Sequence, residues 1–235
     1  MRAKITYCLL VILCASNFAF GQQYANNEED TPRRVNYYHE INIVSDKLKS
    51  DPTNIDLLDE RAMLYMRVRE FEKALEDIDK AIGIAPTKSE LRYTKALILT
   101  QRERYDDAME VINEAIAIDG KREEYFFFRA RLYAFQEDYR NAIHDIDVML
   151  GLNPHCDYCY LQKAIWCKKL NMFYEEIRNY LFYLELSDDE ANKKLVEKRI
   201  KNLRKSDKYF NDLYKAAKKD IRKNGYPWQY KIWNK

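Results

Sequence analysis

The sequence predicts an all-α protein in which antiparallel helix pairs repeat along the chain. Only five glycines and five prolines occur among the 235 residues, so hairpins and phosphate-binding loops lack the residues that form their turns. Small and apolar residues recur at a spacing of 34, a length that suits one helix–turn–helix unit. Nineteen tyrosines and ten phenylalanines provide enough buried area to hold thin helical layers together.

Five series of residues share this regular spacing. Two series are alanines, one is isoleucine, one is aromatic, and one contains the prolines that end each unit. Their members are Ala62, Ala96, Ala130 and Ala164; Ala74, Ala108 and Ala142; Ile78, Ile112 and Ile146; Phe71, Tyr105, Tyr139 and Phe173; and Pro52, Pro86 and Pro154, with Gly120 at the vacant position. The alanines are expected where two helices cross closely, because a larger side chain there would force the axes apart.

At these residues the sequence resembles the tetratricopeptide repeat family. We place four repeats at 55–88, 89–122, 123–156 and 157–190. The resemblance implies a right-handed superhelical solenoid of helix pairs whose first helices line a concave groove. The fourth repeat departs from the pattern, because Glu176 replaces the alanine of its second helix and tyrosines stand at 180 and 183. A wider helix pair is expected there.

Segments on either side of the repeats have their own predicted roles. Residues 1–21 read as a secretory signal, with Arg2 and Lys4 before an apolar run and Ala19-Phe20-Gly21 at the cleavage site. The alternative is an uncleaved anchor, although the apolar run is short for a membrane span. The protein is therefore expected to be exported, to the periplasm or the extracellular envelope. The remaining ranges are a flexible acidic linker (22–34), an N-terminal capping helix (35–54), basic C-terminal capping helices (191–224) and an aromatic basic tail (225–235).

Charge is uneven along the chain. Residues 191–235 carry 15 Lys and Arg against 4 Asp and Glu, whereas the whole chain has a net charge of only +2. Export argues against a nucleic-acid partner for this basic end. Two interpretations remain. The basic end, with Trp228 and Trp233, contacts an acidic surface such as anionic lipid or another envelope protein, or its cations solubilise the terminal capping helix and complement the acidic body of the chain.

Cys156 and Cys159 form the sharpest local motif, and His155 precedes them. Such a pair suits a redox dithiol, a small structural disulfide or half of a metal site. Zinc requires about four ligands, and Cys167 lies too far along the same helix to join the pair. A disulfide or two free thiols are therefore the expected states. We expect no metal and no cofactor.

No set of catalytic roles can be assembled from the remaining polar residues, and we do not expect an enzyme. His144 beside Asp145 is an ordinary pair on a helix surface. Asp77 and Asp79, like Asp145 and Asp147 two repeats later, are two positions apart on a helix and do not converge. All four carboxylates are expected to be solvated.

The family resemblance also implies a partner-binding groove. Family members face the groove with positions 2, 5, 9 and 12 of each first helix, and an adjacent aromatic extends the strip in repeat three. The residues are Met63, Tyr93, Leu97, Phe127, Phe128, Arg131, Tyr158, Leu161 and Ile165. The basic clamp that some members use for a C-terminal carboxylate is absent, since its positions hold Asp59, Met63, Thr94, Glu124 and Phe128.

This apolar strip with an acidic rim predicts a function in binding rather than catalysis. We expect an exported scaffold or adaptor that holds an apolar, partly cationic peptide or helix of a partner protein. The chain's own tail, Trp228–Trp233, fits the same description and is a second candidate occupant. A third interpretation is that the strip is core and binds nothing.

Overall fold

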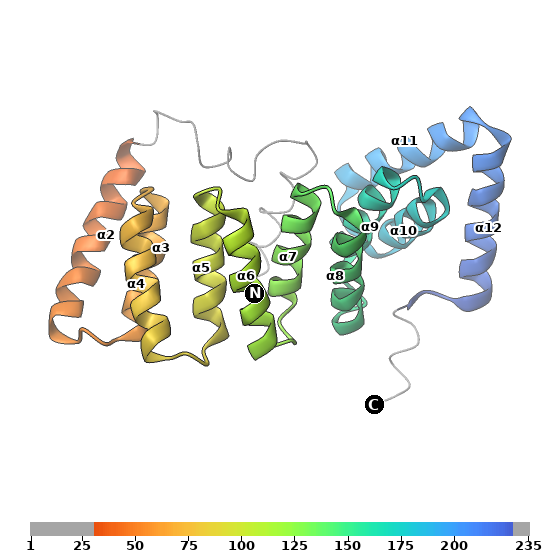
Figure 1. Cartoon of the computed structure of the whole chain (residues 1–235). Coiled ribbons are helices and arrows are strands. Elements are labelled where there is room, and N and C mark those ends of the chain that lie inside the picture. Colours follow the sequence, from red (N-terminus) through yellow and green to blue (C-terminus); the bar gives the residue numbers. More distant parts are fainter. Residues whose placement is uncertain (1–30, 228–235) are drawn as a thin grey trace. The chain divides into compact units, whose positions relative to one another are not determined.

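The structure is a computed structural model that describes residues 31–227, with side chains from residue 36 onward. Within this range the protein is all-α and has no strand, which confirms the predicted fold class (Figure 1). The helices are α2 (Thr31–Ser50), α3 (Ile55–Arg67), α4 (Phe71–Ile84), α5 (Ser89–Gln101), α6 (Tyr105–Ile118), α7 (Glu123–Phe135), α8 (Tyr139–Leu152), α9 (Asp157–Lys169), α10 (Phe173–Leu186), α11 (Glu190–Ser206) and α12 (Lys208–Asn224). The predicted signal, most of the linker and the tail residues 228–235 lie outside the described range.

The helices fall into antiparallel pairs (Figure 1). Each of the four repeat ranges holds one pair: α3–α4, α5–α6, α7–α8 and α9–α10. The chain divides into two compact units, one ending at Tyr125 and the other beginning at Phe126. The superhelix expected from the family resemblance spans both units and stays a prediction.

Helix α2 begins earlier than the sequence indicates. It starts at Thr31, so residues 31–34 of the expected linker are helical. Pro32 is compatible with this start because the first turn of a helix leaves its N–H groups without intrahelical partners anyway. Helix α2 packs on α3 through Ile41, Val44 and Leu48, which are all buried.

The turn inside every helix pair has the same backbone conformation. The second residue before each aromatic has a positive φ: 66° at Arg69, 62° at Glu103, 60° at Glu137 and 56° at Asn171. The next N–H then bonds back to the first helix, as Arg104 N does to the Leu99 carbonyl at 2.9 Å. This is the Schellman ending of a helix, which normally places glycine at the left-handed residue. Here the chain adopts it with side chains that disfavour it.

The predicted interhelical positions are confirmed. The repeated alanines, including Ala108 and Ala142, are completely buried, and so are Ile78, Ile112 and Ile146. A methyl group at each crossing lets the two helices of a pair approach closely. The regular spacing in the sequence thus corresponds to the same packing of two helices in successive repeats.

The expectation that Asp77 and Asp145 are solvated is wrong. Asp77 is 5% exposed and Asp145 is 0% exposed, because an arginine on the first helix of the same pair holds each carboxylate. Arg61 donates to both oxygens of Asp77 at 2.7 Å, and Arg129 donates to those of Asp145 at 2.9 and 2.7 Å. These hydrogen bonds to the carboxylates raise the pKa of both guanidinium groups.

The carboxylates two residues further along, Asp79 and Asp147, form a second kind of ion pair, with lysines. Asp79 pairs with Lys95 at 2.7 Å, and Asp147 pairs with Lys163. Both carboxylates are about half exposed, as expected, and each links the second helix of one repeat to the first helix of the next. These ion pairs therefore recur in every second repeat, while the packing alanines recur in each one.

The C-terminal end of the second unit is closed by α11 and α12. Glu176 is fully buried, and its carboxylate accepts hydrogen bonds from Arg199 of α11, at 2.8 Å from Nε. Tyr180 and Tyr183 are buried in the cluster that includes Val196 and Ile200 of α11. The three residues that break the repeat pattern thus lie where the capping helix packs. Gly225 ends α12 with a φ of 68°, as its sequence position predicts.

Candidate functional site

The first helices of the first unit form one face. Helices α3 and α5 lie in contact, and Thr94 of α5 hydrogen-bonds to Asp59 of α3. Met63, Tyr93 and Leu97 on these helices are half-buried. A partner that covered them would therefore remove apolar surface from water. We call this set, with Asp59, the first-helix face of unit 1.

Tyr93 has a structural role as well as an exposed edge. Its ring lies 5.2 Å, centroid to centroid, from the ring of Tyr125. Tyr125 is fully buried, and its hydroxyl shares a 3.0 Å hydrogen bond with the Ser89 hydroxyl. Truncating Tyr93 would disturb this core, so Met63 and Leu97 are the better probes of binding.

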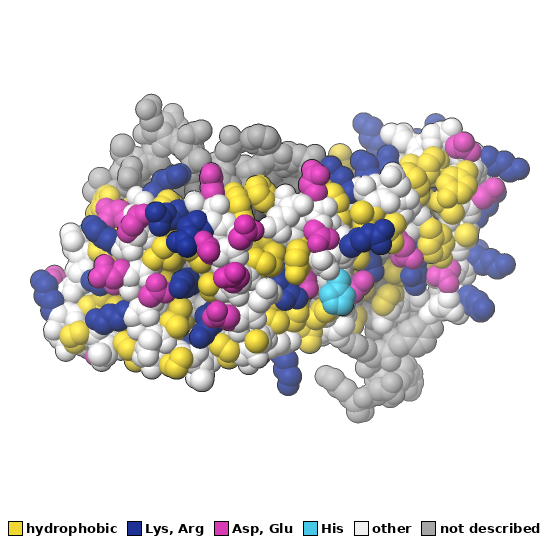
Figure 2. Space-filling view, viewed as in Figure 1, with side chains coloured by type: hydrophobic (Ala, Val, Ile, Leu, Met, Phe, Trp, Pro, Cys, Tyr) yellow, Lys and Arg dark blue, Asp and Glu magenta, His cyan; other side chains and the backbone are white. Residues whose placement is uncertain are grey.

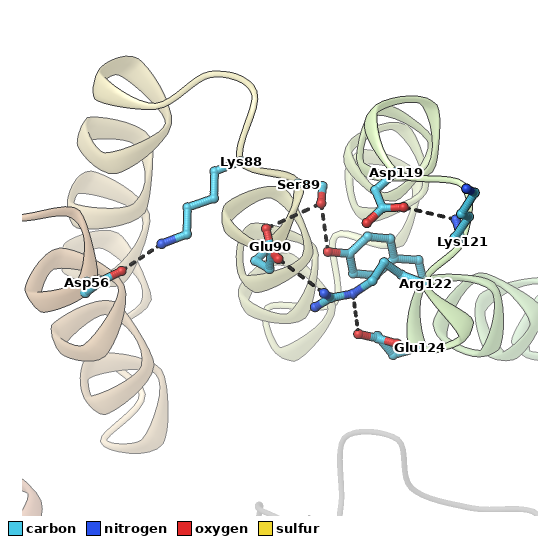
Figure 3. A network of polar contacts seen from close by, with 9 residues as sticks. Asp56, Lys88, Ser89, Glu90, Asp119, Lys121, Arg122 and Glu124 are labelled. Atoms are coloured by element: carbon cyan, nitrogen blue, oxygen red, sulfur yellow. Dashed lines mark hydrogen bonds and ion pairs between the residues drawn. The ribbon is translucent and has the colours of Figure 1, made fainter.

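A row of carboxylates borders the face (Figure 3). Asp56, Glu90 and Glu124 lie in the first turns of α3, α5 and α7, where the helix dipole favours negative charge. Lys88 pairs with Asp56 at 2.7 Å, and Arg122 lies 3.3 Å from Glu90 and 2.7 Å from Glu124. The carboxylates recur once per repeat, and so do these two cations. The rim is thus acidic but partly neutralised.

Asp59 is the carboxylate of this face with unused hydrogen-bonding capacity. Its Oδ1 atom is buried and has no hydrogen-bond partner among the described residues. Burial raises the pKa of Asp59, and the hydrogen bond from Thr94 acts in the opposite direction. A buried charged oxygen without a donor is costly, so a cation or N–H group supplied by a ligand would be favoured at this atom.

In the second unit, three of the predicted groove residues lie together. Phe127 of α7 meets Tyr158 of α9 edge to face, with ring centroids 5.3 Å apart. The Arg131 guanidinium lies 5.8 Å from the centre of the Phe127 ring, within the range of a cation–π interaction. These three residues and Ile165 are half-buried.

Two predicted groove residues belong wholly or partly to the core. Phe128 is only 3% exposed, so the expectation that it contacts a partner is wrong. It follows Phe127 on the helix and therefore points about 100° away from it. Leu161 is half-buried and packs against the cluster that contains Tyr160 and Ala164.

Cys156 and Cys159 are joined by a disulfide, with Cα atoms 5.3 Å apart. The bond spans the first turn of α9, where Cys156 is the residue that precedes the helix. Both cysteines are buried, at 4% and 0% exposure, which hinders the approach of a thiolate that a redox-active pair requires. Cys167 is a buried thiol, and burial raises its pKa to about 12.

Sequence reasoning missed the cations that organise these surfaces. They are Arg61 and Arg129, Lys95 and Lys163, and Lys88 with Arg122. The members of the first two pairs stand at equivalent positions two repeats apart, and those of the third stand one repeat apart. The cations therefore recur at whole multiples of the repeat length. This regular spacing is the sequence signal by which they could have been identified.

Residues 47–132 match the model of the tetratricopeptide repeat family. The matched range spans α3 to α6 and most of α7, and the helix pairs that follow it have the same antiparallel arrangement. No curated protein matches the sequence.

Two kinds of solved structure have the same fold. A crystal structure of MamA is 16% identical, has a TM-score of 0.60 and covers 75% of this chain and 99% of its own. MamA residues 41 to the end from Desulfovibrio magneticus RS-1 are 14% identical, with a TM-score of 0.58 and coverage of 72% and 97%. PilF of Pseudomonas aeruginosa is 16% identical, with a TM-score of 0.61 and coverage of 95% and 92%. At these identities the likeness shows the fold alone.

Within residues 31–227, His, Cys, Asp and Glu side chains do not gather in groups of three that could hold a metal ion. No helix in the same range combines the length and apolarity needed to cross a bilayer.

Proposed function

We propose that this protein is an exported scaffold or adaptor. It binds a peptide or helix of a partner protein on the surfaces formed by the first helices of its repeats. The observation that carries the proposal is the first-helix face of unit 1, where half-buried apolar side chains lie beside a buried carboxylate oxygen that lacks a donor among the described residues. Repeat proteins of this fold are typically non-catalytic and bind protein partners. Export rests on the sequence of residues 1–21.

The chemistry of the face defines the kind of ligand. Met63 and Leu97 would be covered by apolar side chains, because the energy of such contacts comes from excluding water. Asp59 would receive a lysine, an arginine or a backbone N–H group, because its Oδ1 finds no donor in the described part of the chain. The ligand is therefore an apolar segment with at least one cation, which is the chemistry that the sequence predicted.

Selection from a random peptide library on the immobilised mature chain tests this proposal. Selected peptides should combine apolar residues with Lys or Arg. Their affinity, measured by calorimetry, should fall when Met63 and Leu97 are both replaced by serine. The matched control replaces Ile84 and Ile118, which are each 41% exposed on second helices, by serine. Equal losses in both variants would contradict the assignment of the face.

Asp59→Asn separates binding from stability. Removing the charge of a carboxylate whose buried Oδ1 has no donor among the described residues should leave the free energy of unfolding unchanged or raise it by about 1 kcal/mol. The same change should weaken the binding of a cationic peptide. A variant that binds the selected peptides as well as the unmodified protein would show that Asp59 is not part of the site.

A further inference from the structure

The capping helices α11 and α12 carry a surface that the proposed function does not use. Together they contain 13 Lys and Arg against 4 Asp and Glu. Figure 2 shows these cations as dark blue side chains projecting outward over α11 and α12, at the upper right. Their arrangement on each helix decides whether this is scattered charge or an organised face.

On α11 the cations form one stripe. Val196, Ile200 and Leu203 are buried and define the inner side of the helix. At about 100° per residue, four exposed lysines fall within about 50° of the opposite direction. They are Lys194, Lys198, Lys201 and Lys205. None of the four forms an ion pair with another residue in the described part of the chain.

Helix α12 repeats the arrangement. Ala217 and Ile221 are buried and define its inner side, and five exposed cations fall within about 60° of the opposite direction. They are Lys208, Lys215, Lys219, Arg222 and Lys223. We call these five cations and the four lysines of α11 the cationic face.

The cationic face is held in place by specific contacts within unit 2. Arg199 of α11 is fixed to the buried Glu176. On α12, Asp220 pairs with Arg178 at 3.3 Å, and the Phe210 ring meets Phe173 of α10 at 5.0 Å. The arginines that hold the capping helices against α10 thus differ from the cations of the cationic face, which are exposed to solvent.

The composition of the face suits a surface of spread negative charge. Eight of its nine cations are lysines, whose ammonium groups act as mobile point charges rather than as rigid forks for one carboxylate or phosphate. Leu195 and Tyr209, at 62% and 58% exposure, flank the two stripes and could enter the interfacial layer of a bilayer. Neighbouring lysines of this kind bind anionic lipid by adding small contributions.

We propose that the cationic face docks the protein on a membrane surface that contains anionic phospholipid. The interaction is peripheral and depends on ionic strength.

Vesicle co-sedimentation of the full mature chain tests the proposal. Vesicles of phosphatidylcholine alone are compared with vesicles that also contain phosphatidylglycerol, at low and at high salt. Binding is expected only to the anionic vesicles, and it should weaken as salt screens the charges. Absence of binding to anionic vesicles at low salt would overturn the proposal.

Two variants of equal charge locate the surface. The first replaces Lys194, Lys198, Lys201 and Lys205 by glutamine. The control replaces four exposed lysines elsewhere, Lys47, Lys121, Lys168 and Lys169, by glutamine. Each lysine near an anionic surface contributes about fivefold to partitioning, so the first variant should lose more than about a hundredfold and the control far less. Both should melt like the unmodified chain, because all the replaced residues are exposed.

Two other outcomes would overturn the proposal. Equal losses in the two variants would assign binding to net charge rather than to the cationic face. Concentration-dependent self-association that the first variant abolishes, in a protein that does not bind vesicles, would assign the face to the acidic surface of a second copy. Peptide binding by the first variant is measured in parallel. A variant that still binds the selected peptides but has lost vesicle binding shows that the loss concerns the cationic face alone and leaves the proposed function intact.

Discussion

Arg129 holds the carboxylate of Asp145 with two hydrogen bonds, and that carboxylate is completely buried. The guanidinium also lies 5.9 Å from the centre of the Tyr133 ring. Arg61, Asp77 and Tyr65 have the same relationship two repeats earlier. The two helices of repeats one and three are thus joined by a buried ion pair in addition to their apolar contacts.

Breaking the buried pair should be strongly destabilising. Asp145→Ala leaves a largely buried arginine without its partner and should cost about 3–5 kcal/mol, whereas Arg129→Met with Asp145→Leu should be nearly neutral. Asp147→Ala is the control, because that carboxylate is 48% exposed and its pair should contribute at most about 1 kcal/mol. Urea unfolding of the variants measures these differences. A loss for Asp145→Ala no larger than for Asp147→Ala would refute the role assigned to the pair.

Glycine should stabilise the turns inside the helix pairs. Glu103 and Glu137 have φ values of 62° and 60°, so Glu103→Gly and Glu137→Gly should each raise the free energy of unfolding by about 0.5–1 kcal/mol. Asn171→Gly should gain less, because asparagine tolerates this conformation. Thermal and urea unfolding report the change. If Glu103→Ala is as stable as Glu103→Gly, backbone conformation is not the cause.

Enlarging an interhelical alanine should destabilise its repeat. Ala142 is completely buried, and Ala142→Leu should cost about 1–3 kcal/mol by overpacking the α7–α8 crossing. Ala117 is exposed on α6, so Ala117→Leu is the matched control and should melt like the unmodified protein. Equal melting temperatures for the two variants would mean that the assigned register of the repeat is incorrect.

Removal of the disulfide should be tolerated. A loop as short as that between Cys156 and Cys159 stabilises by about 2 kcal/mol or less in the loop-entropy model. A serine replacing Cys156 also precedes α9, where it can cap the helix and offset part of the loss. Circular dichroism and melting of the double serine variant should show a folded protein. Unfolding on reduction alone would contradict this prediction.

Alkaline pH should weaken the second unit through its buried tyrosines. Burial raises the pKa of Tyr180 from its ordinary value of 10.0 to about 12. Its contribution to stability is therefore complete below pH 10 and is lost as pH rises toward 12, because the unfolded chain releases the proton first. Urea unfolding across the alkaline range, from neutral pH to just below 12, should show a smaller decline for Tyr180→Phe than for the unmodified protein. An identical decline would exclude this tyrosine as a contributor.

The repeat architecture was predictable because an alanine that recurs at the repeat spacing is explained by a close crossing of two helices. Ala108 and Ala142 mark helix crossings wherever they recur, so the register followed from the sequence. Asp145 was harder, because a carboxylate on a helix is normally solvated and its burial depends on Arg129, which comes from another helix. Phe128 was misassigned for a related reason: in a run of three phenylalanines, only the packing of neighbouring helices shows which ring is inside. The unused oxygen of Asp59 could not be inferred from sequence at all.

The recurrence of the ion pairs in every second repeat has a consequence for how the protein can change in length. Deleting repeat two (89–122) would place Arg129 where Lys95 now stands, so Asp79 and Asp145 would compete for one guanidinium. Deleting repeats two and three together (89–156) would instead bring Lys163 to that place, and Asp79 would keep an ammonium partner. Engineered deletions of two repeats should therefore disturb these ion pairs less than deletions of one repeat.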